Sequence, residues 1–373
     1  MRIVIAPDSF KGSASAVHVC DAIAAGWRDV RPDDELVLLP MADGGEGTLD
    51  AFLLAVPGSS RVHVEVVGPD GQEVEASWAL LPPTPELPGG TGVVELAETS
   101  GLPLMTHPDP LGAHTLGFGQ AIADALDRGV SRLLLAIGGS ASTDGGTGAL
   151  VALGASLLDA DGDPLELGGG VLSDVARVDL SELPPLPSSG ALVLSDVTNP
   201  LLGETGAAHV FGEQKGADAA QRAALDLALA HWARAAQDAG AAVDPSTSGA
   251  GAAGGTGFGL LAWGATLVSG ASTIADAIGL DDALSGADLV ITGEGRYDAQ
   301  TDGGKAPAVV AERAGAAGVP MALVAGSIAV KPVGFADAVA LAELAGDVQS
   351  AIDDPVRWLR RAGAVLAERA GRP

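Results

Sequence analysis

Several short apolar runs in this chain share one feature: each is followed at once by a polar segment rich in glycine, hydroxyl or acidic side chains. The runs are residues 2–6, 36–39, 133–137, 191–194 and 289–291. The first run leads into helical apolar spacing at Val17, Cys20 and Trp27, for which Ser13 or Ser15 is the expected N-cap. Strand, loop and helix in succession predict an α/β protein with a parallel sheet.

The middle of the chain has a different pattern. Residues 62–66 and 74–80 alternate apolar and polar side chains, which predicts a β-hairpin. At 373 residues, and roughly 150 residues per domain, two domains are expected. We expect a doubly wound parallel domain of the Rossmann or flavodoxin-like kind, carrying an inserted mixed α/β domain, with the active site in the cleft between them. The expected ranges are 1–60 plus 280–373 for the first domain and 61–279 for the inserted one.

Charge and cysteine content narrow the possible partners. A net charge of −28 argues against a nucleic-acid partner, because a protein needs a cationic surface to bind the phosphate backbone. It argues against binding to anionic membranes for the same reason. Cys20 is the only cysteine, so no intramolecular disulfide is possible and a cytoplasmic location is expected. The uncharged stretch 245–275 is broken by glycines, unlike a membrane span. The oligomeric state stays open, a homo-oligomer included.

The most polar of the segments that follow strands is residues 292–307. It holds three carboxylates, an arginine, the only tyrosine, a lysine and four glycines. We interpret it as too polar and too glycine-rich for a core, and therefore as a reactive loop. Open α/β sheets bind ligands beyond the carboxyl ends of their strands, where such a loop would lie.

Lysines and carboxylates together suggest phosphoryl transfer. Lys11, Lys215 and Lys305 lie in polar segments flanked by glycine, whereas Lys331 carries no such signal. Lysine is a compact charge suited to phosphates. Carboxylates after the strands could bind Mg²⁺ or act as a base, although Asp-Gly-Gly can also be only a turn. The carboxylates are Asp8, Asp43, Glu46, Asp144, Asp196, Glu294 and Asp298.

Familiar motifs for other chemistries are absent or incomplete. The segment 301–306 lacks the first glycine of a P-loop, because Ala299 occupies that position, and has no Ser or Thr after its lysine. Residues 249–254 match G-x-G-x-x-G but do not follow a predicted strand, so they indicate a helix start or a phosphate cradle rather than a dinucleotide site. No histidine spacing suggests a metal site or a hydrolase.

Taken together, the motifs resemble those of the bacterial glycerate kinases that phosphorylate D-glycerate with ATP. They occur in the family's order over nearly the whole chain. They are APDSFK (6–11), ADGGEGT (42–48), IGGSA (137–141) with DGG (144–146), Asp196 with NPL (199–201), FG (211–212) with QKG (214–216), GAGAAGG (249–255), and TGEGR (292–296) with Asp298, QT (300–301) and GKAP (304–307). The resemblance implies two α/β domains, D-glycerate and ATP as substrates, and Mg²⁺.

The resemblance and the residue chemistry together suggest roles. Asp8 and Asp196 are candidates for general base and metal ligand, in either order. Lys11 and Arg296 would hold the substrate carboxylate, with Ser9 and Asp43 nearby, and Glu294 and Asp298 would be linked to the metal. The residues expected to bind ATP are Gly138, Gly139, Ser140, Lys215, Gly251, Gly254 and Lys305.

The expected product is 2-phosphoglycerate, and other outcomes stay open. A kinase that forms 3-phosphoglycerate, or one acting on another small hydroxy acid, would share these loops. A non-catalytic regulator that binds anions is a further alternative.

Overall fold

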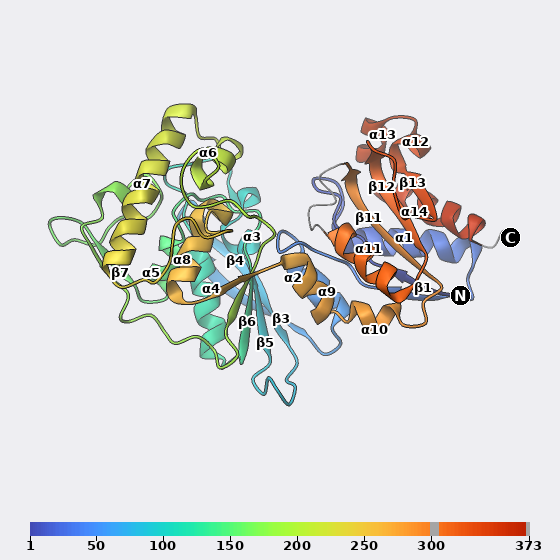
Figure 1. Ribbon diagram of the computed structural model, residues 1–373, viewed down its shortest axis with the longest axis horizontal. Coiled ribbons are helices and arrows are strands. Elements are labelled where there is room, and N and C mark those ends of the chain that lie inside the picture. The colour runs from blue at the N-terminus through green and yellow to red at the C-terminus, as the bar shows by residue number, and fades with distance from the viewer. Residues whose placement is uncertain (299–305, 371–373) are drawn as a thin grey trace. The chain divides into compact units, whose positions relative to one another are not determined.

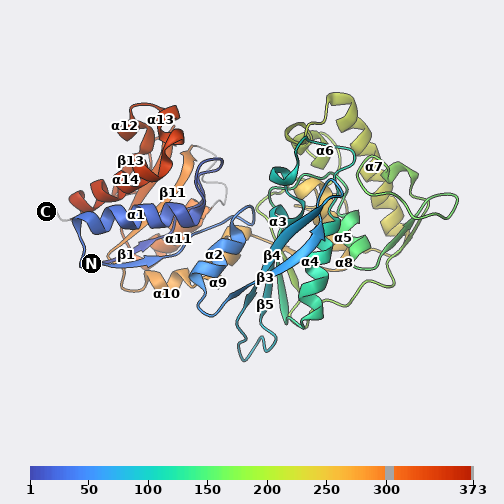
Figure 2. The same ribbon diagram turned by 180° about the vertical axis from the view of Figure 1, so that it is seen from behind.

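The computed structural model describes residues 1–298 and 306–370, and the chain divides into two compact units. Unit 1 comprises Met1–Asp43, Asp50–Pro57 and Ser269–Pro373; unit 2 comprises Gly44–Leu49 and Gly58–Val268. Each unit is a β-sheet with helices packed on it (Figures 1 and 2). The α/β class predicted from the sequence is confirmed.

Unit 1 is built on a parallel sheet with the strand order β13-β12-β11-β1-β2. Ile3 of β1 pairs with Leu289 of β11 on one side and with Leu36 of β2 on the other. The first strand, β1, is therefore an inner strand of the sheet, and one of its two neighbours comes from a part of the sequence 286 residues away. The strands are β1 (Arg2–Ile5), β2 (Glu35–Leu38), β11 (Leu289–Tyr297), β12 (Met321–Ile328) and β13 (Asp337–Ala340).

Helices cover both faces of this sheet. On one face, Ile3 shares a hydrophobic core with Ile23 of α1 and Leu359 of α14; α11 lies on the opposite face (Figures 1 and 2). Burial on both faces explains the nearly continuous apolar runs of the parallel strands. Ser15 caps α1 by accepting a hydrogen bond from the His18 amide at 3.3 Å. The helices are α1 (Ala16–Val30), α2 (Thr48–Ala55), α9 (Gly270–Ala277), α10 (Leu280–Leu284), α11 (Ala306–Ala317), α12 (Leu341–Ala345), α13 (Val348–Asp353) and α14 (Pro355–Arg369).

Unit 2 contains a mixed sheet with the order β10-β9-β6-β5-β4-β3. The predicted hairpin is the antiparallel pair β3 and β4, and β5, β6, β9 and β10 continue the sheet in parallel. A separate antiparallel pair, β7 and β8, was not predicted. The strands are β3 (Ser60–Val67), β4 (Glu73–Leu81), β5 (Thr91–Glu95), β6 (Arg132–Ala136), β7 (Ser156–Leu158), β8 (Arg177–Asp179), β9 (Ala191–Leu194) and β10 (Thr266–Val268).

The helices of unit 2 include several that are very short. The longest of those described is α7, which begins with a capping box between Asp218 and Gln221. The α-helices are α3 (Leu96–Ser100), α4 (Leu116–Asp127), α5 (Thr147–Ala152), α6 (Ala207–Phe211), α7 (Ala219–Asp238) and α8 (Thr256–Trp263). The 3₁₀ turns are η1 (Leu102–Leu104), η2 (Leu172–Asp174), η3 (Glu213–Lys215) and η4 (Ala252–Gly255).

The interpretation of residues 292–307 as a loop too polar for the core is wrong in its first part. Strand β11 continues to Tyr297, and Thr292 and Glu294 are buried. The glycines permit close strand packing: a Cβ atom on Gly293 would lie 2.0 Å from the carbonyl oxygen of Val324. Parallel pairing with β12 therefore extends three positions beyond Glu294, to Tyr297 and Ile328.

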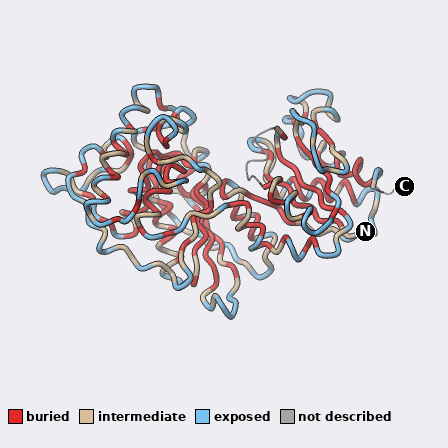
Figure 3. Tube along the Cα trace, viewed as in Figure 1, coloured by how far each residue is buried: buried red, intermediate tan, exposed pale blue. Residues whose placement is uncertain are grey.

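The central strands are the most deeply buried parts of both units (red in Figure 3). Among the helices that the structure describes, none has the length and apolar character needed to cross a bilayer.

Candidate active site

A cavity of about 450 Å³ in unit 1 gathers many of the residues singled out in the sequence. It lies at the carboxyl ends of β1, β11 and β12, and the helical segment that contains Val348 and Ile352 forms an apolar wall. This is the edge at which parallel sheets bind ligands. The predicted residues that line it are Asp8, Ser9, Lys11, Asp43, Glu294, Arg296 and Asp298.

Asp8 is held at the end of β1 by the neighbouring strand. Its amide donates a hydrogen bond to the carbonyl oxygen of Gly293 at 2.8 Å, and its Oδ1 accepts one from the Ser9 amide at 2.6 Å. Only 7% of Asp8 is exposed. This burial, and after it the negative charge of Asp43, raises the pKa of Asp8 to about 7. A carboxyl group that titrates near neutral pH is suited to act as a general base.

Two cations of the cavity remain accessible although each has an acidic neighbour. Lys11 Nζ lies 3.3 Å from Asp43 Oδ2, and Arg296 Nε lies 3.3 Å from Asp298 Oδ2. The side chains of Lys11 and Arg296 are 76% and 69% exposed. Exposed pairs of this kind are weak, so either cation can turn to an incoming carboxylate at little cost.

The carboxylates of this cavity could supply some, but not all, of the ligands of a Mg²⁺ ion. Within residues 1–298 and 306–370, no group of three or more His, Cys, Asp or Glu side chains is arranged to hold a metal ion. Mg²⁺ in kinases takes one or two carboxylates and completes its shell with water and substrate phosphates. Glu294 and Asp298, with oxygen donors beside the cavity, have the required chemistry.

In unit 2, the segment after β6 is organised by a buried carboxylate. Asp144 is fully buried, and its Oδ2 accepts hydrogen bonds from the amide and the hydroxyl of Thr115 at 2.9 and 2.7 Å. The Asp144 carboxylate also accepts two hydrogen bonds at 3.2 Å, from the Gly146 amide to Oδ1 and from the Gly148 amide to Oδ2. Asp144 thus joins the starts of α4 and α5, and the interpretation of it as only a solvated turn former is wrong.

Three of the residues expected to bind ATP meet at this segment. Lys215 is only 2% exposed, and its ammonium donates to the carbonyl oxygen of Ser142 and lies 3.5 Å from Ser140 Oγ. Burial lowers the pKa of Lys215 to about 8. Gly254 packs against the same place, since a Cβ atom there would lie 2.0 Å from the carbonyl oxygen of Ser142.

The other predicted residues have separate positions. Gly138 donates to the carbonyl oxygen of Gly44 at 2.9 Å, and Gly139 has a φ of 77°, which favours glycine. Gly251 donates to the carbonyl oxygen of Asn199 at 3.0 Å. Asp196 is half-buried beyond the end of β9. Lys305 lies outside the described residues.

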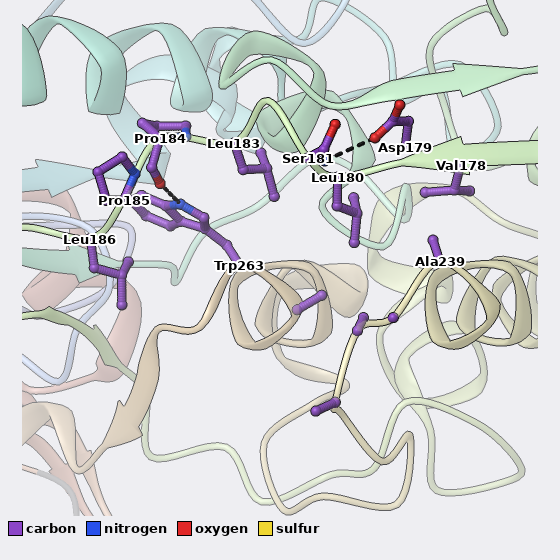
Figure 4. Close-up of a pocket in the computed structure, with 14 residues that line it drawn as sticks. Val178, Asp179, Leu180, Ser181, Leu183, Pro184, Pro185, Leu186, Ala239 and Trp263 are labelled. Carbon is purple, nitrogen blue, oxygen red and sulfur yellow. Dashed lines mark hydrogen bonds between the residues drawn. The ribbon is translucent and has the colours of Figure 1, made fainter.

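A second cavity, of about 470 Å³, contains none of the predicted residues. It lies in unit 2, between residues 178–186 and the segments around Ala239 and Trp263 (Figure 4). Two of its polar groups are bonded within the protein: Trp263 Nε1 donates to the Pro184 carbonyl oxygen at 2.8 Å, and the Ser181 amide donates to Asp179 Oδ1 at 2.9 Å. Because this cavity contains none of the residues that the sequence singled out, we assign the site to the first cavity.

Comparison with known proteins identifies the family of the chain. The model of the glycerate kinase family matches residues 3–370. The chain belongs to the glycerate kinase family. Family membership confirms the predicted enzyme class, a kinase with ATP as phosphoryl donor.

Similar glycerate kinases occur in distant bacteria. The chain is 43% identical over 332 residues to the glycerate 2-kinase of Escherichia coli K12, covering 88% of this chain and 86% of that protein. It is 44% identical over 330 residues to a glycerate kinase of Halalkalibacterium halodurans, covering 87% and 85%. A crystal structure from Salmonella typhimurium LT2, provisionally named glycerate kinase 2, aligns with a TM-score of 0.82 at 40% identity, covering 99% of this chain and 98% of that one.

Proposed function

We propose that the protein transfers the γ-phosphoryl group of Mg-ATP to the 2-hydroxyl of D-glycerate, giving 2-phosphoglycerate and ADP. One observation carries this proposal: a buried carboxyl group with a pKa near neutrality, Asp8, shares a cavity with two exposed cations, Lys11 and Arg296. The two cations are suited to bind the carboxylate of a small substrate. The carboxyl group of Asp8 is suited to accept a proton from a hydroxyl next to that carboxylate.

In the proposed reaction, Lys11 and Arg296 bind the carboxylate of glycerate, with Ser9 and Asp43 beside them. Asp8 accepts the proton of the 2-hydroxyl as that oxygen forms a bond to the γ-phosphorus. The bond from this phosphorus to the β–γ bridging oxygen breaks, and ADP leaves. A base contributes roughly 10²–10⁴ in rate, and most when its pKa lies near the working pH.

The triphosphate is proposed to bind the unit 2 segments that contain Gly138, Gly139, Ser140, Gly251 and Gly254. Within them, the amides of Gly138 and Gly251 donate to the carbonyl oxygens of Gly44 and Asn199, so these two glycines shape the segments while neighbouring amides would meet the phosphates. Backbone amides in glycine-rich turns are a common cradle for phosphates. From the sequence alone, Lys305 is proposed as a further ligand of the phosphates. Asp196, Glu294 and Asp298 are the proposed ligands of Mg²⁺, which supplies charge neutralisation of the phosphates when it is bound.

Replacement of the base tests the proposal. Asp8→Asn should lower kcat by roughly 10²–10⁴ while the KM for ATP changes little, because the amide cannot accept the proton. Asp21→Asn, an exposed aspartate on α1, is the matched control and should behave as the parent enzyme. Near-parental turnover in folded Asp8→Asn would remove Asp8 from this role and leave Asp196 as the candidate.

The position of the new phosphate can be determined by coupling to enolase. With D-glycerate and Mg-ATP, phosphoenolpyruvate should appear at once, because enolase uses 2-phosphoglycerate directly. A requirement for added phosphoglycerate mutase would identify the 3-phosphate instead. A panel of other hydroxy acids, each at equal concentration, tests the alternative acceptors.

A further inference from the structure

Lys215 differs from Lys11 of the unit 1 cavity because its charge is enclosed by protein. It is 2% exposed, whereas the Lys11 side chain is 76% exposed. The Lys215 ammonium donates to the carbonyl oxygen of Ser142, with Ser140 Oγ 3.5 Å away. A buried charge is tolerated only when its hydrogen bonds are satisfied, and these partners belong to the segment that follows β6.

The same two serines connect Lys215 to the rest of that segment. Ser140 Oγ accepts a hydrogen bond from the Ser142 amide at 3.2 Å, and Ser142 Oγ donates to Asp144 Oδ1 at 3.0 Å. Asp144 in turn holds the start of α4 through Thr115 and the start of α5 through Gly148. One continuous buried network therefore runs from the ammonium to two helix starts.

On its other side, Lys215 borders a strained turn. Ala253 in η4 has a φ of 54°, the one positive φ of a non-glycine residue in the described chain. Next to it, a Cβ atom on Gly254 would lie 2.9 Å from Lys215 Nζ. Ser140 Oγ lies 3.4 Å from the Ala253 carbonyl oxygen, and the Gly145 amide donates to Gly254 at 3.1 Å. Such backbone strain persists only where surrounding contacts fix it.

We propose that Lys215 is a positioning residue that acts as an internal cation. Its ammonium holds residues 138–146 and 251–256 together in the conformation that presents their amides to the triphosphate, and it does so without touching ATP. This inference rests on the proposed function for the role of those segments. The sequence led us to expect a direct contact between Lys215 and phosphate. In this proposal Lys215 acts on ATP binding only through the segments that it holds in place.

Hydrogen exchange of the ligand-free protein tests the positioning role. In Lys215→Met, amides of 138–148 and 251–256 should exchange at least about tenfold faster than in the parent, as expected for the loss of one hydrogen bond to a charged group. Amides of the unit 1 sheet should not exchange faster. Lys331→Met, which removes an exposed lysine, is the matched control and should leave every segment unchanged.

Kinetics of the same variants add a second readout. In Lys215→Met, the KM for ATP should rise by about tenfold or more, while the KM for D-glycerate stays at the parental value. An elevated KM for ATP without faster exchange in the ligand-free protein would overturn the inference, because that is the behaviour of a direct phosphate ligand. Unchanged exchange and unchanged KM would overturn it as well.

A second variant keeps the inference testable if Lys215→Met does not fold. Ser140→Ala retains the lysine but removes the hydroxyl between the Ser142 amide and Ala253, so the amides of 251–256 should again exchange faster. Parental exchange in Ser140→Ala would then count against the network. A parent protein without glycerate kinase activity would contradict the proposed function alone, since the exchange experiment needs no turnover.

Discussion

At the scale of single residues, the substrate cavity makes one carboxyl group titrate in the neutral range. Burial and the negative charge of Asp43 raise the pKa of Asp8 to about 7. Because a general base must be unprotonated, kcat/KM should increase with pH, with a midpoint near this value. Below it, most of Asp8 carries a proton, and kcat/KM should fall about tenfold per pH unit if Asp8 is the proposed base.

Asp43→Asn should move this midpoint to lower pH. The substitution removes a like charge beside Asp8 and frees Lys11, whose charge favours the ionised form of Asp8. The measurement is the pH dependence of kcat/KM for D-glycerate in both proteins. A midpoint that stays in place, or moves to higher pH, would contradict the assignment of this limb to Asp8.

The buried charge of Lys215 should lower the free energy of unfolding of the protein. Its pKa is about 8 in the folded state and 10.5 as an ordinary lysine, so the folded state binds fewer protons between these values. The free energy of unfolding of the parent should therefore rise with pH across that window. At pH 7 the buried charge costs about 3 kcal/mol, at 1.36 kcal/mol per pKa unit.

Lys215→Met should accordingly be the more stable protein at pH 7, by up to about 3 kcal/mol. Denaturant unfolding of both proteins at several pH values measures the difference, which should shrink toward pH 10.5. A variant less stable than the parent at pH 7 would show that the ammonium stabilises the fold. Faster local exchange in a more stable protein is no contradiction, because local opening and global unfolding are separate equilibria.

Sequence reasoning located many residues of the candidate site but not their environments. Asp8 and Asp43 lie within a few residues of the ends of short apolar runs, and that position is visible in the sequence. The burial of Lys215 is not, because it depends on packing between segments far apart in the chain. Asp144 was singled out as an acid, but its role required knowing that Thr115 lies beside it.

At the scale of elements, α1 and α14 cross so closely that glycine is required in both. A Cβ atom on Gly26 would lie 1.8 Å from the Arg360 carbonyl oxygen, and one on Gly363 would lie 2.2 Å from that of Ile23. Gly26→Ala should therefore destabilise the protein by roughly 1–3 kcal/mol, the usual cost of overpacking.

Gly315→Ala is the matched control for this crossing. Gly315 is an exposed residue of α11 with open space where a Cβ atom would be. Alanine there should stabilise the protein by about 0.5–1 kcal/mol, because glycine is a poor helix former. The measurement is the Tm of each variant relative to the parent. Equal changes in Tm for the two substitutions would mean that α1 and α14 can separate to admit a methyl group.

The longer elements of the fold could be predicted from the sequence, and the shortest could not. Apolar runs and helical spacing identified β1, β6, β9 and α1 close to their observed positions. The three-residue strands β7, β8 and β10 are too short to show a period. The second half of β11 was missed because its buried polar groups and glycines resemble a loop in sequence.

At the scale of the whole molecule, a net charge of −28 implies repulsion within the folded chain. Raising NaCl from about 0.02 to 0.3 M shortens the Debye length below 10 Å. Tm should rise by roughly 2–4 °C, equivalent to a gain near 1 kcal/mol. Charge-neutral sorbitol at equal osmolality is the control, and a Tm independent of salt would mean that the acidic side chains are too far apart to matter.

The strand order of unit 1 also constrains how the protein can be made. Ala6 at the end of β1 and Thr292 of β11 are joined by a hydrogen bond although 286 residues separate them. At roughly 5–20 residues per second, the ribosome needs on the order of tens of seconds to deliver the second partner. During that interval β1 has β2 as a possible partner but lacks β11, its neighbour on the other side. The emerging N-terminal segment is thus an apolar client for chaperones, while residues 58–268 of unit 2 have already been synthesised.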